Sequence, residues 1–476
     1  MASWDKHKAY APLVLLWCSQ AFVLSGCDDD GSGRSQAGQS EVIEADQEPL
    51  TGAELLDPKR CQPCHPEHYD EWAKSMHAYA SEDPVFIALN QKGQRETEGE
   101  LGDFCVQCHA PVAQRLGLTS DGLNLSALPS YAQGVTCAYC HQVSEVTGEH
   151  SNQLTWANDG VMRGPLRTLT GGRAHRSKYS PHLDRSDLSS SDLCGACHDI
   201  VTPTGLHLER TYWEWRQTLF NDEDPRYSNT CNDCHMPRVQ TEGGRRRSSH
   251  LMPAVDVHLT PHPGREEQRD AVLAELRYTV LTELCVLVSE LGGAELEVTL
   301  ENISAGHRFP SGAALDRRVW VELSAWSAEG ALLWESGRGE LDQPVSAWGG
   351  DTWLLRDQAF NRLGEPSHSF WELTDVTRGT LPGPSPLIAP MPVEDTHVTR
   401  AYRFGTDGVV ARVELKVWMR PIGLELLQEL IEGGDLSAEV LSFSTVLELE
   451  GASKIWRPDE AVRAISRSGR EMLCLP

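Results

Sequence analysis

The pattern Cys-x-x-Cys-His occurs five times between residues 61 and 235. In this pattern two thiols can add to the vinyl groups of a porphyrin, and the adjacent imidazole can bind the iron. The cysteines are Cys61, Cys64, Cys105, Cys108, Cys137, Cys140, Cys194, Cys197, Cys231 and Cys234, and the histidines are His65, His109, His141, His198 and His235. The sequence therefore predicts five covalently bound haem c groups, and a chain that wraps them must use them as much of its core.

Zinc and disulfides are the alternative uses of paired cysteines. A zinc ribbon does not need a histidine directly after every second cysteine. A disulfide framework would leave the same histidine without a role. The histidine that follows the second cysteine in every copy of the motif therefore favours haem over zinc and over disulfides.

The sixth ligand of each iron decides what the iron can do. A second imidazole suits electron transfer, whereas an open position permits chemistry on a substrate. A lone histidine is more often a surface residue than a ligand, but nine histidines lie between residues 66 and 265 outside the motifs. The candidates for sixth ligands are His77, His150, His175, His182, His250 and His307.

His307 is the one candidate outside the haem region. It lies in Gly306-His307-Arg308-Phe309-Pro310, where glycine allows close backbone approach and the phenylalanine can pack on a porphyrin edge. We expect His307 to approach the haem held by His235 or His198. A buried loop histidine is the alternative.

The first 27 residues have the features of a lipoprotein signal peptide. Lys6 and Lys8 precede the apolar stretch 11–24, which is too short for a stable membrane helix. Leu24-Ser25-Gly26-Cys27 is typical of a lipobox and predicts a lipid anchor at Cys27; an ordinary signal peptide is the alternative. We expect a membrane-anchored lipoprotein of a Gram-negative bacterium, on the periplasmic or cell-surface side, where haem is attached.

Composition divides the rest of the chain into three parts. Residues 28–50 are rich in Asp, Gly and Ser and predict a disordered tether. Residues 51–265 carry every motif and predict a haem-cored domain of short helices and loops, including one helix over 67–79. Residues 266–476 predict a β-sandwich-like domain, so the fold class is mixed.

The β prediction depends on alternating apolar and polar residues. The segments that alternate are 295–300, 319–323, 411–419 and 441–450, and residues 424–432 predict one helix. Cys285 and Cys474 lie near the two ends of this region. In an oxidising compartment they can pair; two free buried thiols are the alternative.

Several features occur together in residues 55–200: Trp72 and Ser75-x-His77-Ala78 after the first motif, the closely spaced second and third motifs, and Gly148-Glu149-His150 before the fourth. This part of the chain resembles the tetrahaem cytochromes that accept electrons from hydroxylamine oxidoreductase. The resemblance implies that His77 is the sixth ligand of the third haem and His150 that of the first. It also implies an open or weakly occupied position at the second haem, on His109.

The chain departs from this family after the fourth motif. The fifth motif resembles those of larger multihaem cytochromes related to hydroxylamine oxidoreductase and the pentahaem nitrite reductases. The segment 306–320 resembles C-terminal β domains of uncharacterised multihaem cytochromes. Cys-x-x-Cys-Lys does not occur in the sequence, so the lysine-ligated active haem of the pentahaem nitrite reductases is missing.

Charge narrows the functions further. The formal net charge is -27, which excludes nucleic acid as a partner and favours redox donors and acceptors with basic surfaces. We expect an electron carrier rather than a substrate-converting enzyme. The alternative is an oxidoreductase acting on a small nitrogen or sulfur compound, such as nitrite, hydroxylamine or tetrathionate, at an open haem. A structural or sensory protein is a third possibility, without positive support.

Overall fold

The computed structural model describes residues 49–168, 174–241, 244, 246–384 and 396–475. The predicted signal peptide and Cys27, with nearly all of the tether, lie outside the described residues. Among the described residues, no helix is both long and apolar enough to cross a membrane. Residues 47–476 form one compact unit.

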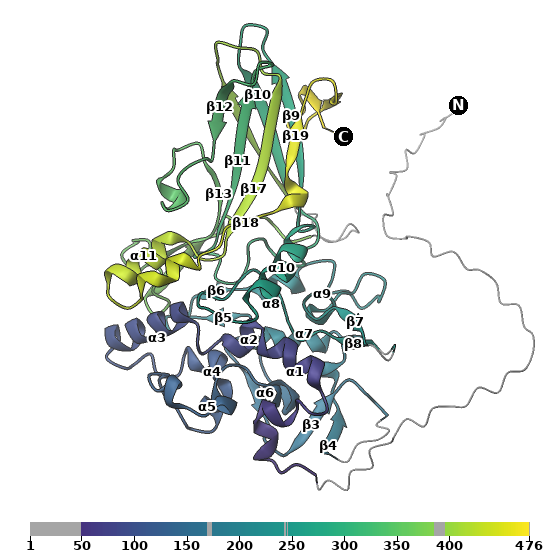
Figure 1. Ribbon diagram of the computed structural model, residues 1–476, viewed down its shortest axis with the longest axis vertical. Helices are drawn as coiled ribbons and strands as arrows, with labels where there is room; N and C mark the ends of the chain where they lie inside the picture. Colours follow the sequence, from purple (N-terminus) through teal and green to yellow (C-terminus); the bar gives the residue numbers. More distant parts are fainter. Residues whose placement is uncertain (1–48, 169–173, 242–243, 245, 385–395, 476) are drawn as a thin grey trace, which may run out of the picture. The chain divides into compact units, whose positions relative to one another are not determined.

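The haem region consists of short helices and two-stranded ribbons (Figure 1). The helices are α1 (Pro66–Ala73), α2 (Met76–Tyr79), α3 (Pro84–Glu96), α4 (Val106–His109), α5 (Pro111–Arg115), α6 (Cys137–His141), α7 (Ser189–Gly195), α8 (Thr211–Arg216), α9 (Cys231–His235) and α10 (Arg265–Leu276). The ribbons are β1 (Val143–Val146) with β2 (Leu154–Trp156), β3 (Val161–Gly164) with β4 (Arg176–Tyr179), β5 (Ile200–Val201) with β6 (His207–Glu209), and β7 (Arg238–Gln240) with β8 (Arg246–Ser248).

The single helix predicted over 67–79 is two helices. Ser75 interrupts it, because its hydroxyl accepts a hydrogen bond from the backbone N–H of Ala78 at 3.3 Å and donates to the carbonyl of Trp72 at 2.8 Å. Serine is a favoured N-cap residue for this reason. The break starts a separate helix, α2, which carries His77.

The C-terminal region contains two antiparallel sheets. One has the order β16-β10-β9-β21-β20, and the other has β12-β11-β17-β18, with β13 on β11 and β19 on β17. The strands are β9 (Val280–Val288), β10 (Ala294–Asn302), β11 (Arg318–Trp326), β12 (Leu332–Ser336), β13 (Trp353–Leu355), β16 (His397–Phe404), β17 (Arg412–Arg420), β18 (Leu447–Glu448), β19 (Lys454–Trp456), β20 (Val462–Ile465) and β21 (Glu471–Cys474). A separate hairpin joins β14 (Gln358–Asn361) to β15 (Leu373–Thr377).

One hydrophobic core lies between these two sheets. It takes buried side chains from both, including Leu296 and Val298 of β10 and Val413, Leu415 and Val417 of β17. The alternation in β17 is the predicted one, since every second residue faces the core. The strand predicted over 441–450 is wrong for most of its length: a 3-10 helix capped by Ser437 ends at Ser442, and only Leu447–Glu448 is strand.

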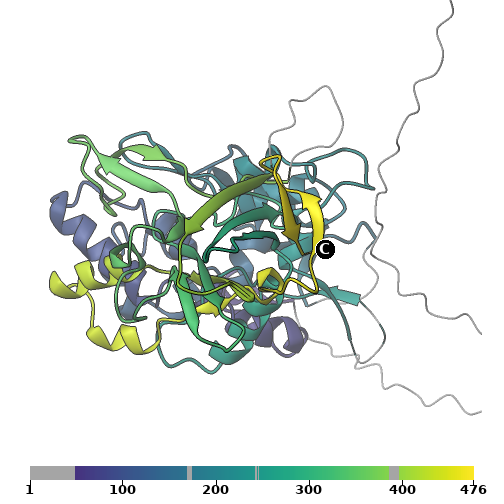
Figure 2. The ribbon, with the colours of Figure 1, turned by 90° about the horizontal axis from the view of Figure 1, so that it is seen from above.

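A disulfide and one helix complete the region. Cys285 and Cys474 form a disulfide and face each other across β9 and β21. The predicted pairing is thus present, and the two cysteines are not free thiols. Helix α11 (Leu424–Glu432) has the predicted bounds and packs against α3 of the haem region (Figures 1 and 2). Arg95 of α3 forms a bidentate ion pair, at 2.6 and 2.8 Å, with Asp435, which lies just after the C-terminal end of α11. The haem region and the β region are therefore in contact.

Candidate functional site

All ten motif cysteines and all five motif histidines line one cavity of about 1570 Å³. Pockets for single small ligands measure roughly 300–1,000 Å³, so this cavity is larger than one such ligand requires. Its size suits several bulky groups side by side. The thiols are free, as covalent attachment requires.

Local helical geometry turns each motif towards the cavity. In the first, second and fourth motifs the backbone N–H of the histidine donates to the backbone carbonyl of the first cysteine, with N···O distances of 2.8, 3.2 and 2.9 Å. The third and fifth motifs are the helices α6 and α9. Residues i, i+3 and i+4 of a helix share one face, so both thiols and the imidazole project together.

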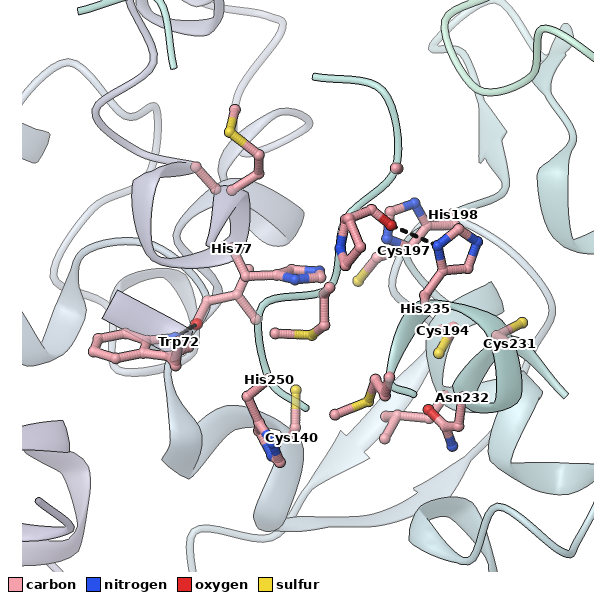
Figure 3. Close-up of a pocket in the computed structure, with 18 of the residues that line it drawn as sticks. Trp72, His77, Cys140, Cys194, Cys197, His198, Cys231, Asn232, His235 and His250 are labelled. Atoms are coloured by element: carbon pink, nitrogen blue, oxygen red, sulfur yellow. Dashed lines mark hydrogen bonds between the residues drawn. The ribbon is translucent and has the colours of Figure 1, made fainter. Parts of the chain in front are cut away.

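Four motif histidines face a second imidazole. The ring centres are 6.5 Å apart for His65 and His175, 6.4 Å for His141 and His250, 6.0 Å for His198 and His77, and 6.5 Å for His235 and His307. Figure 3 shows His77 pointing towards His198. A metal between two imidazoles separates their ring centres by about 6 Å, because each metal–nitrogen bond is about 2 Å long. These four pairs have the spacing of axial ligands.

His109 differs from the other four. Among the described residues no second imidazole lies opposite it. Its ring instead stacks on Phe86 at 4.1 Å with an interplanar angle of 4°, and its Nδ1 lies 3.1 Å from the carbonyl of Ala80. Of the five motif histidines, His109 is therefore the one for which the described part of the chain offers no facing imidazole.

Backbone carbonyls hold many of these rings by Nδ1. The distances are 2.7 Å from His141 to Arg163, 2.6 Å from His235 to Pro253, 3.1 Å from His250 to Ser248, and 2.7 Å from His307 to Arg308. A carbonyl only accepts, so Nδ1 carries the hydrogen and Nε2 keeps its lone pair. This arrangement is typical of histidines that bind metals.

Burial favours the neutral form of several imidazoles at the cavity. Burial and the nearby His198 lower the pKa of His77 to about 3, and burial and His141 lower the pKa of His250 to about 3. Burial also lowers the pKa values of His198 and His307 to about 4. A neutral imidazole is the form that donates to a metal.

Contacts between thiols reveal which motifs are neighbours. The thiols of Cys61 and Cys137, of Cys108 and Cys197, and of Cys194 and Cys231 lie near enough to shift each other's pKa values. Burial and the nearby Cys197 raise the pKa of Cys140 to about 12. The first motif therefore adjoins the third, the third and second adjoin the fourth, and the fourth adjoins the fifth; Figure 3 shows the last contact.

Two predicted placements are wrong. His77, carried by the separate helix α2, faces His198 and not His141, which is opposite His250. His150 lies beside His207 at 5.7 Å and not beside His65. Backbone hydrogen bonds from Ser151 to Asp199 and from Asn152 to Ala196 hold the His150 turn against the segment of the fourth motif.

The remaining candidates lie at the cavity. His182 lines it, with Nδ1 3.0 Å from the carbonyl of Ser189, but among the described residues it faces no motif histidine. His307 reaches the fifth motif, one of the two positions expected for it; its binding to iron stays a prediction. His175 and His250 were candidates without an assigned haem, and the fold places them opposite His65 and His141.

Sequence reasoning missed several residues of the site. Glu71 accepts a hydrogen bond from the backbone N–H of His250 and forms an ion pair with Arg247, which positions the His250 loop. Glu209 lines the cavity, and burial raises its pKa to about 7. No local pattern marks these residues, because long-range packing brings them to the cavity.

The donor set fits covalent haem better than bare metal. Among the described residues no group of three or more His, Cys, Asp and Glu side chains is arranged to hold a metal ion. The motif thiols instead share a cavity wall with imidazoles that face one another across it. This arrangement argues against the zinc alternative.

Comparison with known proteins agrees with this geometry. Residues 60–142, which contain the first three motifs, match the family described as cytochrome c554 and c-prime. A crystal structure of a penta-heme cytochrome c552 from Thermochromatium tepidum has 19% sequence identity and a TM-score of 0.58, and covers 85% of this chain and 99% of that chain. No curated protein matches. The chain therefore has a multihaem cytochrome c fold.

Proposed function

We propose that this protein is an electron-transfer cytochrome that binds five haem c groups through the ten motif cysteines. One observation carries the proposal: all five motifs open into one cavity, and four of their histidines face a second imidazole. Two imidazoles close the iron to substrate and suit it to transfer electrons. The 19% identical penta-heme cytochrome supports the number five through its fold.

The protein residues have separate roles in this function. The cysteines would tether each porphyrin, and the bound haem would supply the one-electron redox chemistry. His65, His109, His141, His198 and His235 would hold the irons from one side, and carbonyl contacts at Nδ1 orient the rings of His109, His141 and His235. His175, His250, His77 and His307 would hold them from the other side for the first, third, fourth and fifth motifs. Burial keeps the paired imidazoles at the third motif (His141 and His250) and at the fourth motif (His198 and His77) unprotonated.

The thiol contacts suggest a route for electrons. The order first, third, fourth, fifth connects neighbouring motifs without a gap. The second motif adjoins the fourth and lies on a branch. Electrons can therefore cross the molecule without passing through the haem on His109.

A second candidate function depends on that branch. The absence of an opposite imidazole among the described residues leaves the distal side of His109 available to a small nitrogen or sulfur compound. Electrons arriving through the fourth haem would serve such a reaction. This function is secondary, because four of the five motifs have the paired imidazoles of electron carriers.

The proposed location is the outer side of a bacterial membrane, with the protein anchored by lipid at Cys27. The support is the lipobox in the sequence and the extracytoplasmic attachment of haem c. Cys27→Ser should release an exported soluble form, measured by fractionating membranes from the periplasm. A variant that stays in the membrane fraction would contradict the anchor.

The central experiment counts haems and spin states. We expect five haems per chain by pyridine haemochrome and denaturing mass spectrometry. Electron paramagnetic resonance should show four low-spin irons and one high-spin iron, the latter assigned by His109→Ala. Two or fewer haems per chain would refute the proposal, and five low-spin irons would refute the open haem alone.

A further inference from the structure

The positively charged side chains that line the cavity fall into two groups. Arg60, Arg163, Arg185, Arg247 and Arg317 each form an ion pair with a carboxylate. Lys59, Lys178, Arg238 and Arg246 also line the cavity, are exposed, and have no ion-pair partner within the described part of the chain. In a protein with a formal net charge of -27, exposed cations that line the cavity without an ion-pair partner among the described residues are unexpected.

Two of these cations share one face of a hairpin. In the β7–β8 ribbon Arg238 pairs with Ser248 and Gln240 pairs with Arg246. Directly opposed residues, and residues two apart on one strand, project to the same face. Arg238 and Arg246 therefore point to one side, and Arg247 points to the other, where it binds Glu67 and Glu71.

The hairpin lies next to the fifth motif. Strand β7 begins three residues after His235, and Cys234 is one of two motif cysteines that are exposed. Arg185 joins the hairpin to the fifth motif, because it forms an ion pair with Asp233 and lies 3.5 Å from the hydroxyl of Ser248.

We infer that the hairpin face with Arg238 and Arg246 is the docking surface for an acidic redox protein that exchanges electrons through the fifth haem. This inference rests on the proposed electron-transfer function. The fifth motif ends the route through the molecule, and its exposed cysteine marks the point where that route reaches solvent. Charge complementarity selects the partner, because carboxylates around the partner's redox centre would meet these cations. This local attraction acts against the negative net charge of the whole protein, which repels anions.

The alternative is that these cations neutralise the propionates of the protein's own haems. If the cations neutralise haem propionates, replacing one of them with glutamate would change the haem reduction potentials. Cations that serve a partner would change the rate of encounter and its dependence on salt, because exposed charges are screened within about 10 Å at 0.1 M salt. The two roles therefore have different signatures.

The test uses the full holoprotein, reduced, with inorganic oxidants of opposite charge. One electron leaves a ferrous haem and converts ferricyanide to ferrocyanide, with no bond formed or broken. In Arg246→Glu the second-order rate with anionic ferricyanide should fall about tenfold at low ionic strength, within the range of electrostatic steering. The rate with cationic tris(phenanthroline)cobalt(III) should rise, and both effects should disappear in 1 M salt.

Arg362→Glu is the matched control, since Arg362 is exposed in the turn between β14 and β15 and does not line the cavity. It changes the net charge equally and should leave both rates within about twofold of wild type. Equal effects of the two variants would overturn the inference in favour of net charge. The double variant Arg238→Glu/Arg246→Glu should deepen the loss with ferricyanide.

Two further results would overturn the inference. Shifted haem midpoint potentials or lost haem in Arg246→Glu, with equal rate changes for both oxidants, would assign the cations to the propionates. Unchanged rates together with lost sedimentation on phosphatidylglycerol vesicles would assign the surface to a membrane. The haem count of each variant is measured first, so failure of the proposed function is seen separately from failure of the docking surface.

Discussion

At the scale of single residues, the position of one imidazole decides whether an iron is closed. His77 faces His198 at a ring distance of 6.0 Å, so His77→Ala should leave the haem on His198 with one protein ligand. We expect a new high-spin signal in the electron paramagnetic resonance spectrum of this variant.

His150→Ala is the matched control for His77. His150 packs against His207 outside the cavity lining, so its loss should leave the spectrum of all five irons unchanged. A new high-spin signal in both His77→Ala and His150→Ala would return the assignment to the pattern that the family resemblance implied, in which both histidines are sixth ligands.

Glu209 should make the stability of the protein depend on pH. Burial raises the pKa of Glu209 in the folded protein to about 7 from an ordinary value of 4.5. Between these values the unfolded chain loses the proton while the folded protein keeps it, so the free energy of unfolding falls as pH rises and levels off above about 7. Relative to wild type, Glu209→Gln should gain up to about 3 kcal/mol between pH 4 and pH 8, measured by chemical denaturation. An equal pH dependence in both proteins would contradict this.

At the scale of elements, one hydroxyl separates α1 from α2 and so places His77. Ser75→Ala removes the cap and should cost about 1 kcal/mol of unfolding free energy. It should also broaden the low-spin signal of the haem on His198, because α2 carries His77.

Ser437→Ala is the control for this cap. Ser437 caps a 3-10 helix in the β region by accepting from the backbone N–H of Glu439 at 3.3 Å. Its loss should lower stability by a similar amount without a change in any haem signal. Identical spectra for the two variants would mean that the break between α1 and α2 does not control His77.

At the scale of the whole molecule, the Cys285–Cys474 disulfide closes a chain segment of 189 residues. Closing a long loop limits the unfolded chain, so Cys285→Ser/Cys474→Ser should lower the free energy of unfolding by about 2–4 kcal/mol. Thermal denaturation would measure the loss, and the haem count should stay at wild-type level. Loss of haem in this variant would mean that the β region is needed for cofactor assembly.

Local sequence patterns determined much of the protein. The five motifs predict the covalent anchors from sequence alone, because attachment needs only five adjacent residues and a helical turn. The alternation in 411–419 and the apolar face of 424–432 identified β17 and α11. Residues on the buried face of a strand or helix recur every two or about every 3.6 positions, so a short segment of sequence is enough to reveal them. The strand expected over 441–450 failed because a capping serine and a buried valine favoured a 3-10 helix there.

Only the tertiary structure decided which histidine faces which motif. His175 and His65 are far apart in sequence, as are His307 and His235, and no local period connects them. Their pairing depends on how ribbons and loops pack around a shared cavity, and on small features such as the cap at Ser75. The same packing leaves Arg238 and Arg246 exposed on one face of the β7–β8 hairpin, in a chain whose net charge is negative. Covalent chemistry is thus local in the sequence, whereas axial ligation and surface charge are set by long-range packing.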